Sequence, residues 1–207
     1  DDIKNKMISD LSIDENSIIF IVGDKRDVVY NSLGALRLKL ADREKLIKND
    51  SWCPLWVVDF PLVEWNEDQN RWDSLHHPFT SPDLKDLDLF DSDPAKINSL
   101  GYDIVMNGYE LGGGSIRIHN KDLQSKIFDL LGIEKEEAKE KFGFLMNAFK
   151  YGAPPHGGIA FGLDRIVMLL AGCNQIRDVI AFPKTTSAMS LMDNSPSNVD
   201  SSQLDEL

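Results

Sequence analysis

Three side chains that can bind charged ligands lie close together in residues 102–119, which read YDIVMNGYELGGGSIRIH. They are Asp103, Glu110 and Arg117. Two carboxylates can share one divalent cation, and an arginine can pair in bidentate fashion with a carboxylate or a phosphate. The combination suits a magnesium nucleotide bound beside an acidic substrate.

The pair Asn107-Gly108 predicts where this segment turns, because a two-residue type I′ turn requires positive φ at both positions. An unbroken ladder from that turn pairs Val105 with Glu110 and Asp103 with Gly112. Side chains alternate between faces, so the two carboxylates share a face at a diagonal distance of about 7 to 8 Å between backbones. We therefore expect a polar site on an otherwise apolar hairpin.

Three consecutive glycines, at residues 112–114, separate Glu110 from Arg117. On a regular strand Arg117 would point into the apolar layer, where an unpaired guanidinium is very costly. A bulge within the glycines reverses the alternation and brings Ser115 and Arg117 to the face of Glu110. We expect a bulge or kink there. The alternative is a surface hairpin whose charged side chains are merely solvated.

A second arginine lies in residues 157–170, GGIAFGLDRIVMLL, which join an apolar strand to a helix. The glycines allow close backbone approach, and Arg165 in the first helical turn can pair with phosphate oxygens. In the alternative, Asp164 favours the helix N-terminus and Arg165 pairs with a neighbouring carboxylate. The segment lacks the lysine and spacing of a P-loop, which argues against a Walker-type site.

Two histidines, His76 and His77, open the proline-flanked loop HHPFTSP at residues 76–82. Adjacent residues on extended backbone point in opposite directions, so joint metal chelation is disfavoured. This also disfavours a metal-dependent hydrolase built on both histidines with Asp103 and Glu110. A mobile lid that presents one donor to a substrate carboxylate is the more attractive interpretation, and two solvated loop histidines are the alternative.

The elements that must position these residues follow from apolar periodicity and from turn residues. The strands grouped as hairpins, with helices between them, predict an α+β fold with an antiparallel sheet flanked by helices. Besides the hairpin, expected strands are residues 18–22, 55–60, two strands around 65–72, 158–161 and 179–182. Expected helices are residues 29–47, 123–131, 138–149 and one starting at 163, with a domain junction near residue 48.

The composition is that of a globular protein, with 207 residues, 42% hydrophobic and 27% charged residues, and a net charge of -12. Bulk charge of that sign argues against generic binding of polyanions. The two cysteines form no zinc or redox spacing, which fits a reducing cytoplasm, and both are expected to be buried. No apolar run reaches about 18 residues, so we expect no membrane partner. The start at Asp1 suggests that an upstream segment is missing.

Five motifs occur in one order along the chain: WVVDFPLVEW, HHPFTSP, YDIVMNGYELGGGSIRIH, YGAPPHGGIAFGLDRIVMLL and DVIAFPKTTSAMSLM. In these motifs the chain resembles the C-terminal half of a bacterial-type aspartyl-tRNA synthetase, a class II aminoacyl-tRNA synthetase. The resemblance implies that residues 1–48 are the C-terminal end of an insertion domain. It also implies that residues 49–207 are the C-terminal part of a class II catalytic domain, including motif 3.

The resemblance implies a two-step activity, in which L-aspartate and ATP form aspartyl-adenylate and the aspartyl group then passes to tRNA(Asp). Glu110 would contact ATP through Mg²⁺, with Asp103 as a second carboxylate near the metal. Arg117 would clamp the side-chain carboxylate of aspartate, a task that suits a guanidinium. His76, aided by His77, would close over the amino acid.

The motif 3 match covers Gly162, Leu163, Asp164 and Arg165, which the resemblance assigns to ATP binding. It places Arg165 on the terminal phosphate. Arg117, Arg165 and Glu110 are the expected catalytic residues.

Three parts of the family are missing from this sequence: motif 1, motif 2 and the anticodon-binding barrel. We therefore expect the isolated chain to be a poor enzyme, and the full-length protein to be a cytoplasmic homodimer. A synthetase for asparagine or lysine and a non-catalytic synthetase-derived module are the alternatives. Charging of tRNA(Asp) alone, or of tRNA(Asn) as well, is left open.

Overall fold

The structure is a computed structural model that describes residues 2–14, 16–48, 51–199 and 204. The chain divides into two compact units, Asp1–Ser51 and Trp52–Leu207. The assignment of residues 1–48 to an insertion domain stays a prediction.

The first unit contains two helices, α1 (Asp2–Asp10) and α2 (Arg26–Arg43), and α2 confirms the helix expected there. The buried strand expected at residues 18–22 is wrong, since this segment is irregular and Ile18 is 79% exposed. An apolar run becomes a strand only where a partner strand pairs with it, and the described residues of this unit contain no other strand.

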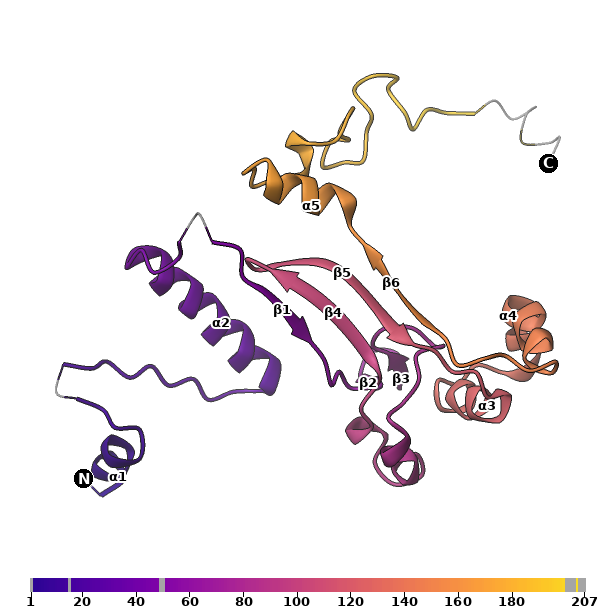
Figure 1. Ribbon diagram of the computed structural model, residues 1–207, viewed down its shortest axis with the longest axis horizontal. Coiled ribbons are helices and arrows are strands. Elements are labelled where there is room, and N and C mark those ends of the chain that lie inside the picture. The colour runs from indigo at the N-terminus through magenta and orange to yellow at the C-terminus, as the bar shows by residue number, and fades with distance from the viewer. Residues whose placement is uncertain (1, 15, 49–50, 200–203, 205–207) are drawn as a thin grey trace. The chain divides into compact units, whose positions relative to one another are not determined.

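The second unit is built on a four-stranded antiparallel sheet in the order β1-β4-β5-β6 (Figure 1). The strands are β1 (Pro54–Val57), β4 (Gly101–Met106), β5 (Tyr109–Ile116) and β6 (Gly157–Phe161). Strands β4 and β5 form a hairpin, and β6 pairs with β5 after two intervening helices. The α+β class predicted from the sequence is confirmed.

The β4–β5 hairpin turns at Asn107-Gly108, where φ is 52° and 85°. Val105 pairs with Glu110 as predicted, but the register then shifts, so that Asp103 pairs with Gly113 and not with Gly112. The predicted position of the bulge is therefore wrong. The extra residue is Leu111, one position before the glycines, and residues 112–114 pair regularly with both neighbouring strands.

The position of the bulge has a packing reason. Leu111 is only 6% exposed, so the extra residue contributes an apolar side chain to the interior. The glycines serve a different purpose, the close approach of β6. A Cβ atom on Gly112 would meet the carbonyl oxygen of Ala160, and one on Gly114 would collide with that of Gly158.

The hydrophobic core lies beside the sheet, where a small hairpin and a helix meet. The hairpin is β2 (Val63–Asn66) with β3 (Arg71–Ser74), and Trp65 pairs with Trp72 as predicted. The helix is α3 (Lys121–Leu130), and α4 (Lys135–Phe149) follows it. The core side chains are Leu62, Val63, Phe90, Ile97, Ile118, Ile127 and Leu131.

The helices α3 and α4 confirm the two expected before and after residue 132. Each is followed by a glycine with positive φ, Gly132 at 69° and Gly152 at 89°. This left-handed conformation is the one that commonly ends helices. Two short 3-10 helices, η1 (Leu84–Leu89) and η2 (Pro94–Lys96), complete this part.

The C-terminal part runs from β6 into helix α5 (Leu163–Leu170) and the 3-10 helix η3 (Ile176–Asp178). The strand and helix confirm the prediction, but the expected burial of the strand is wrong, because all five of its residues are exposed. The strand expected at residues 179–182 is also wrong. The segment consists of a turn followed by bends, and the N–H of Ile180 donates to the carbonyl of Ile176 at 3.2 Å in a local helical bond.

The two cysteines are not buried as expected, since Cys53 is exposed and Cys173 is half-buried. Neither cysteine belongs to the hydrophobic core, so the apolar character of the thiol is not enough to bury it. Among the described helices, none combines the length and the apolar character that a bilayer span requires.

Candidate active site

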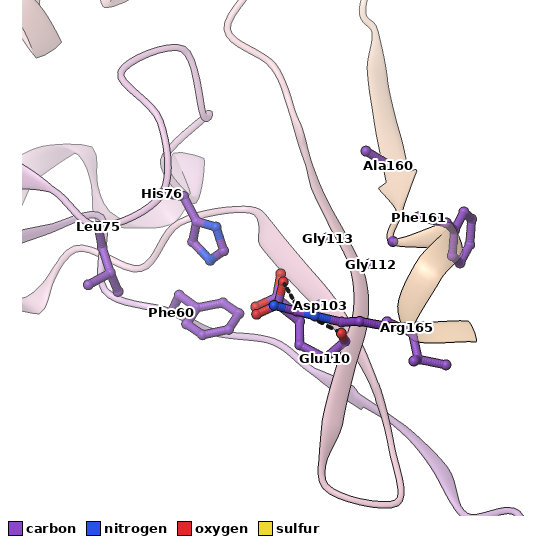
Figure 2. A pocket seen from close by; sticks show the side chains of 12 residues that line it. Phe60, Leu75, His76, Asp103, Glu110, Gly112, Gly113, Ala160, Phe161 and Arg165 are labelled. Carbon is purple, nitrogen blue, oxygen red and sulfur yellow. Dashed lines mark hydrogen bonds and ion pairs between the residues drawn. The ribbon is translucent and has the colours of Figure 1, made fainter. Parts of the chain in front are cut away.

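A cavity of about 730 Å³ opens over the bulged end of the β4–β5 hairpin (Figure 2). Its walls come from Phe60 after β1, from residues 75–76 after β3, from both hairpin strands and from the β6–α5 junction. The lining residues are Phe60, Leu75, His76, Asp103, Glu110, Leu111, Gly112, Gly113, Ala160, Phe161, Gly162 and Arg165.

The two carboxylates predicted to share a face both line this cavity. Asp103 lies opposite Gly113, and a Cβ atom on that glycine would collide with the Asp103 Oδ1. The carboxylate therefore extends across β5 through the space that a glycine leaves. Glu110 reaches the same cavity from the other side of the bulge, opposite Val105.

Arg165 approaches Glu110 from the first turn of α5 (Figure 2). Its Nη1 donates to the Glu110 carbonyl at 2.7 Å and lies 3.7 Å from Oε1 of the same residue. Gly162 fixes the start of the helix, because its N–H donates to the Leu111 carbonyl at 2.7 Å. The ion pair is solvent-exposed. Such a pair contributes little energy. Both contacts use Nη1, so the other guanidinium N–H groups remain available to an anion.

His76 lies across the cavity from Arg165, held by an aromatic neighbour (Figure 2). Its ring packs edge-on against Phe60 with centroids 4.4 Å apart. A Cβ atom on Gly101 would come within 3.0 Å of the His76 ring, so this glycine also makes room for the imidazole.

Arg117 lies on the same face of the sheet as Asp103 but outside the lining of this cavity. Side chains alternate along a strand, so after the bulge residues 113, 115 and 117 point to the face that Asp103 occupies. The Arg117 N–H donates to the His156 carbonyl at 2.9 Å. In the described part of the chain, no side-chain hydrogen bond or ion pair engages its guanidinium.

His77 does not line the cavity that His76 lines, and it lies near Arg117 instead. Burial lowers the pKa of His77 below 6.5, and the positive charge of Arg117 lowers it further, because both disfavour the charged imidazolium. The Phe79 N–H donates to Nδ1 at 3.2 Å, so the neutral ring carries its proton on Nε2. The pair of histidines is therefore split between two environments, as the alternation of extended backbone predicts.

Two of the motif 3 residues, Leu163 and Asp164, do not line the cavity. Leu163 is 70% exposed. Asp164 lies in the first turn of α5, where a carboxylate is favourable for the helix dipole. Sequence reasoning missed several lining residues: Phe60, Leu75, Gly112, Gly113, Ala160 and Phe161. The apolar ones gave no chemical signal, although Phe60 stands beside Pro61 at the end of an expected strand.

The donor set of the cavity suits a polyanion held with a divalent cation. Mg²⁺ is commonly bound by one or two carboxylates together with substrate phosphates and water. Asp103 and Glu110 fit that role. Among the described residues, no group of three or more histidine, cysteine or acidic side chains is arranged to hold a metal.

Comparison with known proteins gives one consistent family. The family described as tRNA synthetases class II (D, K and N) matches residues 7–186. An aspartate–tRNA ligase of Staphylococcus carnosus (strain TM300) is 62% identical over 190 residues, 92% of this chain and 32% of that protein. An aspartate–tRNA(Asp/Asn) ligase of Caldanaerobacter subterraneus subsp. tengcongensis is 53% identical over 203 residues, 98% of this chain and 34% of that protein.

A solved structure gives the same fold. Aspartyl tRNA synthetase from Entamoeba histolytica matches with a TM-score of 0.51 and 22% identity, over 91% of this chain and 32% of that one. At this identity the match concerns the fold alone. The chain spans about a third of the length of the curated relatives.

Proposed function

Because the chain belongs to the class II tRNA synthetases of the D, K and N family, we propose that it supplies part of the catalytic domain of an aspartate–tRNA ligase. One observation carries the proposal. Asp103, Glu110 and Arg165 converge on a single cavity, in a chain more than half identical to such ligases. Two carboxylates and a guanidinium at one wall match the needs of a metal-bound triphosphate.

The proposed first step joins L-aspartate to ATP. An oxygen of the α-carboxylate attacks the α-phosphorus, the bond from that phosphorus to the bridging oxygen breaks, and its electron pair leaves with pyrophosphate. A hydroxyl of the terminal ribose of tRNA(Asp) then attacks the carbonyl carbon of the aspartyl-adenylate, the bond from that carbon to the phosphate oxygen breaks, and AMP leaves. The substrate carboxylate is itself the nucleophile, so the protein contributes positioning and charge neutralisation.

The residues divide these tasks by position. Arg165 binds the terminal phosphate with the N–H groups that Glu110 leaves available. Arg117 clamps the side-chain carboxylate of aspartate on the same face of the sheet. His76 closes over the amino acid from the Phe60 side, and His77 supports that loop.

Asp103 and Glu110 are the residues that would hold Mg²⁺. The bound cation would neutralise charge on the phosphate oxygens. Gly113 supports this arrangement, because a Cβ atom there would collide with the Asp103 Oδ1 and the carboxylate would have to turn away from its present position.

The remaining partners rest on the family. We propose ATP, L-aspartate and tRNA(Asp) as substrates, a second copy of the full-length protein as homodimer partner, and the cytoplasm as the location. Gly162, Leu163 and Asp164 form the helix start that presents Arg165, and we assign them to ATP binding through backbone and helix position.

The test is aspartate-dependent exchange between ATP and pyrophosphate by the full-length protein. Exchange with aspartate, and none with asparagine or lysine, is the expected result. Thermal shifts with ATP, Mg²⁺ and each amino acid provide a second readout, because a ligand that binds only the folded state raises the melting temperature. Exchange that requires asparagine or lysine would overturn the aspartate assignment.

A further inference from the structure

A second cavity of about 600 Å³ adjoins the active-site cavity at Arg165. The two cavities share Glu110 and Arg165 as a common wall. The second is lined by the tip of the β4–β5 hairpin, by α5 and by the segment after α5. Its lining residues are Gly108, Tyr109, Glu110, Arg165, Met168, Asn174, Gln175, Ile176 and Arg177.

The polar groups of this second cavity come from residues 174–177. Helix α5 is followed by Gly172, whose φ of 68° turns the chain back, and the N–H of Cys173 donates to the Met168 carbonyl at 2.9 Å. This turn brings Asn174, Gln175 and Arg177 to the cavity. Within the described part of the chain, their side chains make no hydrogen bond or ion pair, so their donors are free to meet a ligand.

The charges favour an anion. Glu110 is the only acidic group in the lining, and it is already paired with Arg165 at 3.7 Å. Arg177 therefore adds an unmatched positive charge, and the two neighbouring amides add neutral donors. A guanidinium and amide N–H groups together match phosphate oxygens in geometry and in charge. An excess of positive charge at this point contrasts with the net charge of -12 of the chain.

We propose that the second cavity is a subsite for inorganic pyrophosphate, with Arg177 as its main binding residue. This inference rests on the proposed function, because pyrophosphate is the leaving group of aspartate activation. When the bond between the α-phosphorus and the bridging oxygen breaks, the electron pair remains on pyrophosphate and increases its negative charge. The anion then passes from the cavity that Arg165 shares with Asp103 to the cavity that Arg165 shares with Arg177.

The test uses Arg177→Ala in the full-length protein and the exchange reaction with pyrophosphate varied. The KM for pyrophosphate rises about tenfold or more, as expected for the loss of a charge-assisted pair. The KM for aspartate stays at the parent value. Arg177→Lys restores part of the loss, because lysine keeps the charge but lacks the planar fork.

A matched control is Arg37→Ala, which removes an exposed arginine on α2, outside the lining of both cavities. It leaves both KM values unchanged. A folded Arg177→Ala protein with an unchanged KM for pyrophosphate overturns the subsite, and so does an equal rise in the KM for aspartate and for pyrophosphate.

Failure of the proposed function gives a different result. A parent protein without aspartate-dependent exchange overturns the proposed function, and calorimetry with inorganic pyrophosphate alone then decides the subsite. Binding that weakens about tenfold or more in Arg177→Ala supports it. Binding that is absent, or equal in both proteins, overturns it.

Discussion

Two regions of residues 52–207 differ sharply in how far their apolar side chains are buried. The core end is the region around the hydrophobic core, where Ile97, Ile118 and Ile127 are between 0 and 2% exposed. The α5 end is the region around helix α5, where Leu163 and Leu170 are 70 and 69% exposed. The core end supports the loop of residues 76–82, in which Thr80 is 2% exposed and forms an isolated antiparallel β-bridge with Arg117. The α5 end carries Arg165.

This difference teaches that the two halves of the proposed site are held by different forces. Close packing fixes the part of the sheet that carries Arg117, because a core side chain, Ile118, follows it directly. Arg165 is fixed by one hydrogen bond to a backbone carbonyl and by an exposed ion pair. Substitutions in the core should therefore affect stability, and substitutions at the cavity walls should affect ligand binding.

The largest expected effect is on stability at the core end. Ile127, at 2% exposure, is one of the most buried side chains. Ile127→Ala leaves a cavity, which costs about 2 to 5 kcal/mol of unfolding free energy, measured by chemical denaturation of the full-length protein. The control is the exposed Leu163 at the α5 end. Leu163→Ala should change stability by no more than about 0.5 kcal/mol. Equal losses in both variants would abolish the contrast between the two ends.

The next effect separates activity from stability at the core end. Arg117→Ala should lower kcat/KM for aspartate in the exchange reaction about a hundredfold or more, because a substrate carboxylate loses its bidentate partner. Arg117→Lys should recover only part of it. Substantial exchange retained by the alanine variant would remove the clamp assignment, provided that its melting curve matches the parent.

A smaller effect is expected where a glycine makes room for a carboxylate. Gly113→Ala places a methyl group where the Asp103 Oδ1 lies, and that flexible side chain must turn away. The Mg²⁺ concentration for half-maximal exchange should rise about tenfold, as for the loss of one metal contact. Gly143→Ala on α4 is the control, because its Cβ atom meets only Lys139 Cγ at 3.6 Å. An unchanged Mg²⁺ requirement would separate Asp103 from the metal.

The smallest effect concerns the pH dependence of stability through His77. Its folded pKa lies below 6.5, so between that lowered value and the unfolded one the unfolded state binds more protons. Stability due to this group is present above the unfolded pKa and is lost as the pH falls through the window. His77→Gln should therefore flatten the fall in melting temperature between about pH 8 and about pH 5.

The control for His77 is His119→Gln, an exposed imidazole two positions beyond Arg117. A pH profile for His77→Gln that matches the parent profile would show that the His77 environment differs from the one described. The same profile measured for Arg117→Ala should be flatter than the parent profile, because the second cause of the lowered pKa is gone.

Local patterns predicted the parts of the fold that depend on neighbouring residues. The Asn107-Gly108 turn, the Trp65–Trp72 hairpin and the helices before Gly132 and Gly152 are present because turn chemistry and apolar spacing act over a few residues. Predictions of strands were wrong where the strand would have needed a partner strand from a distant part of the chain. Residues 18–22 and 179–182 have apolar runs of strand type, but in neither case does the structure supply the ladder that a strand requires.

The candidate site divides in the same way. The residue types of Asp103, Glu110, His76 and Arg165 determined the chemistry, and the turn at Asn107-Gly108 determined that the two carboxylates share a face. The tertiary structure decided that the bulge lies at Leu111, because burial of a leucine favours that position and the approach of β6 requires the glycines to remain in regular pairing. It also decided that Arg177 lines the same cavity as Arg165. The sequence shows that both residues are arginines, but only the turn after α5 brings them to one cavity.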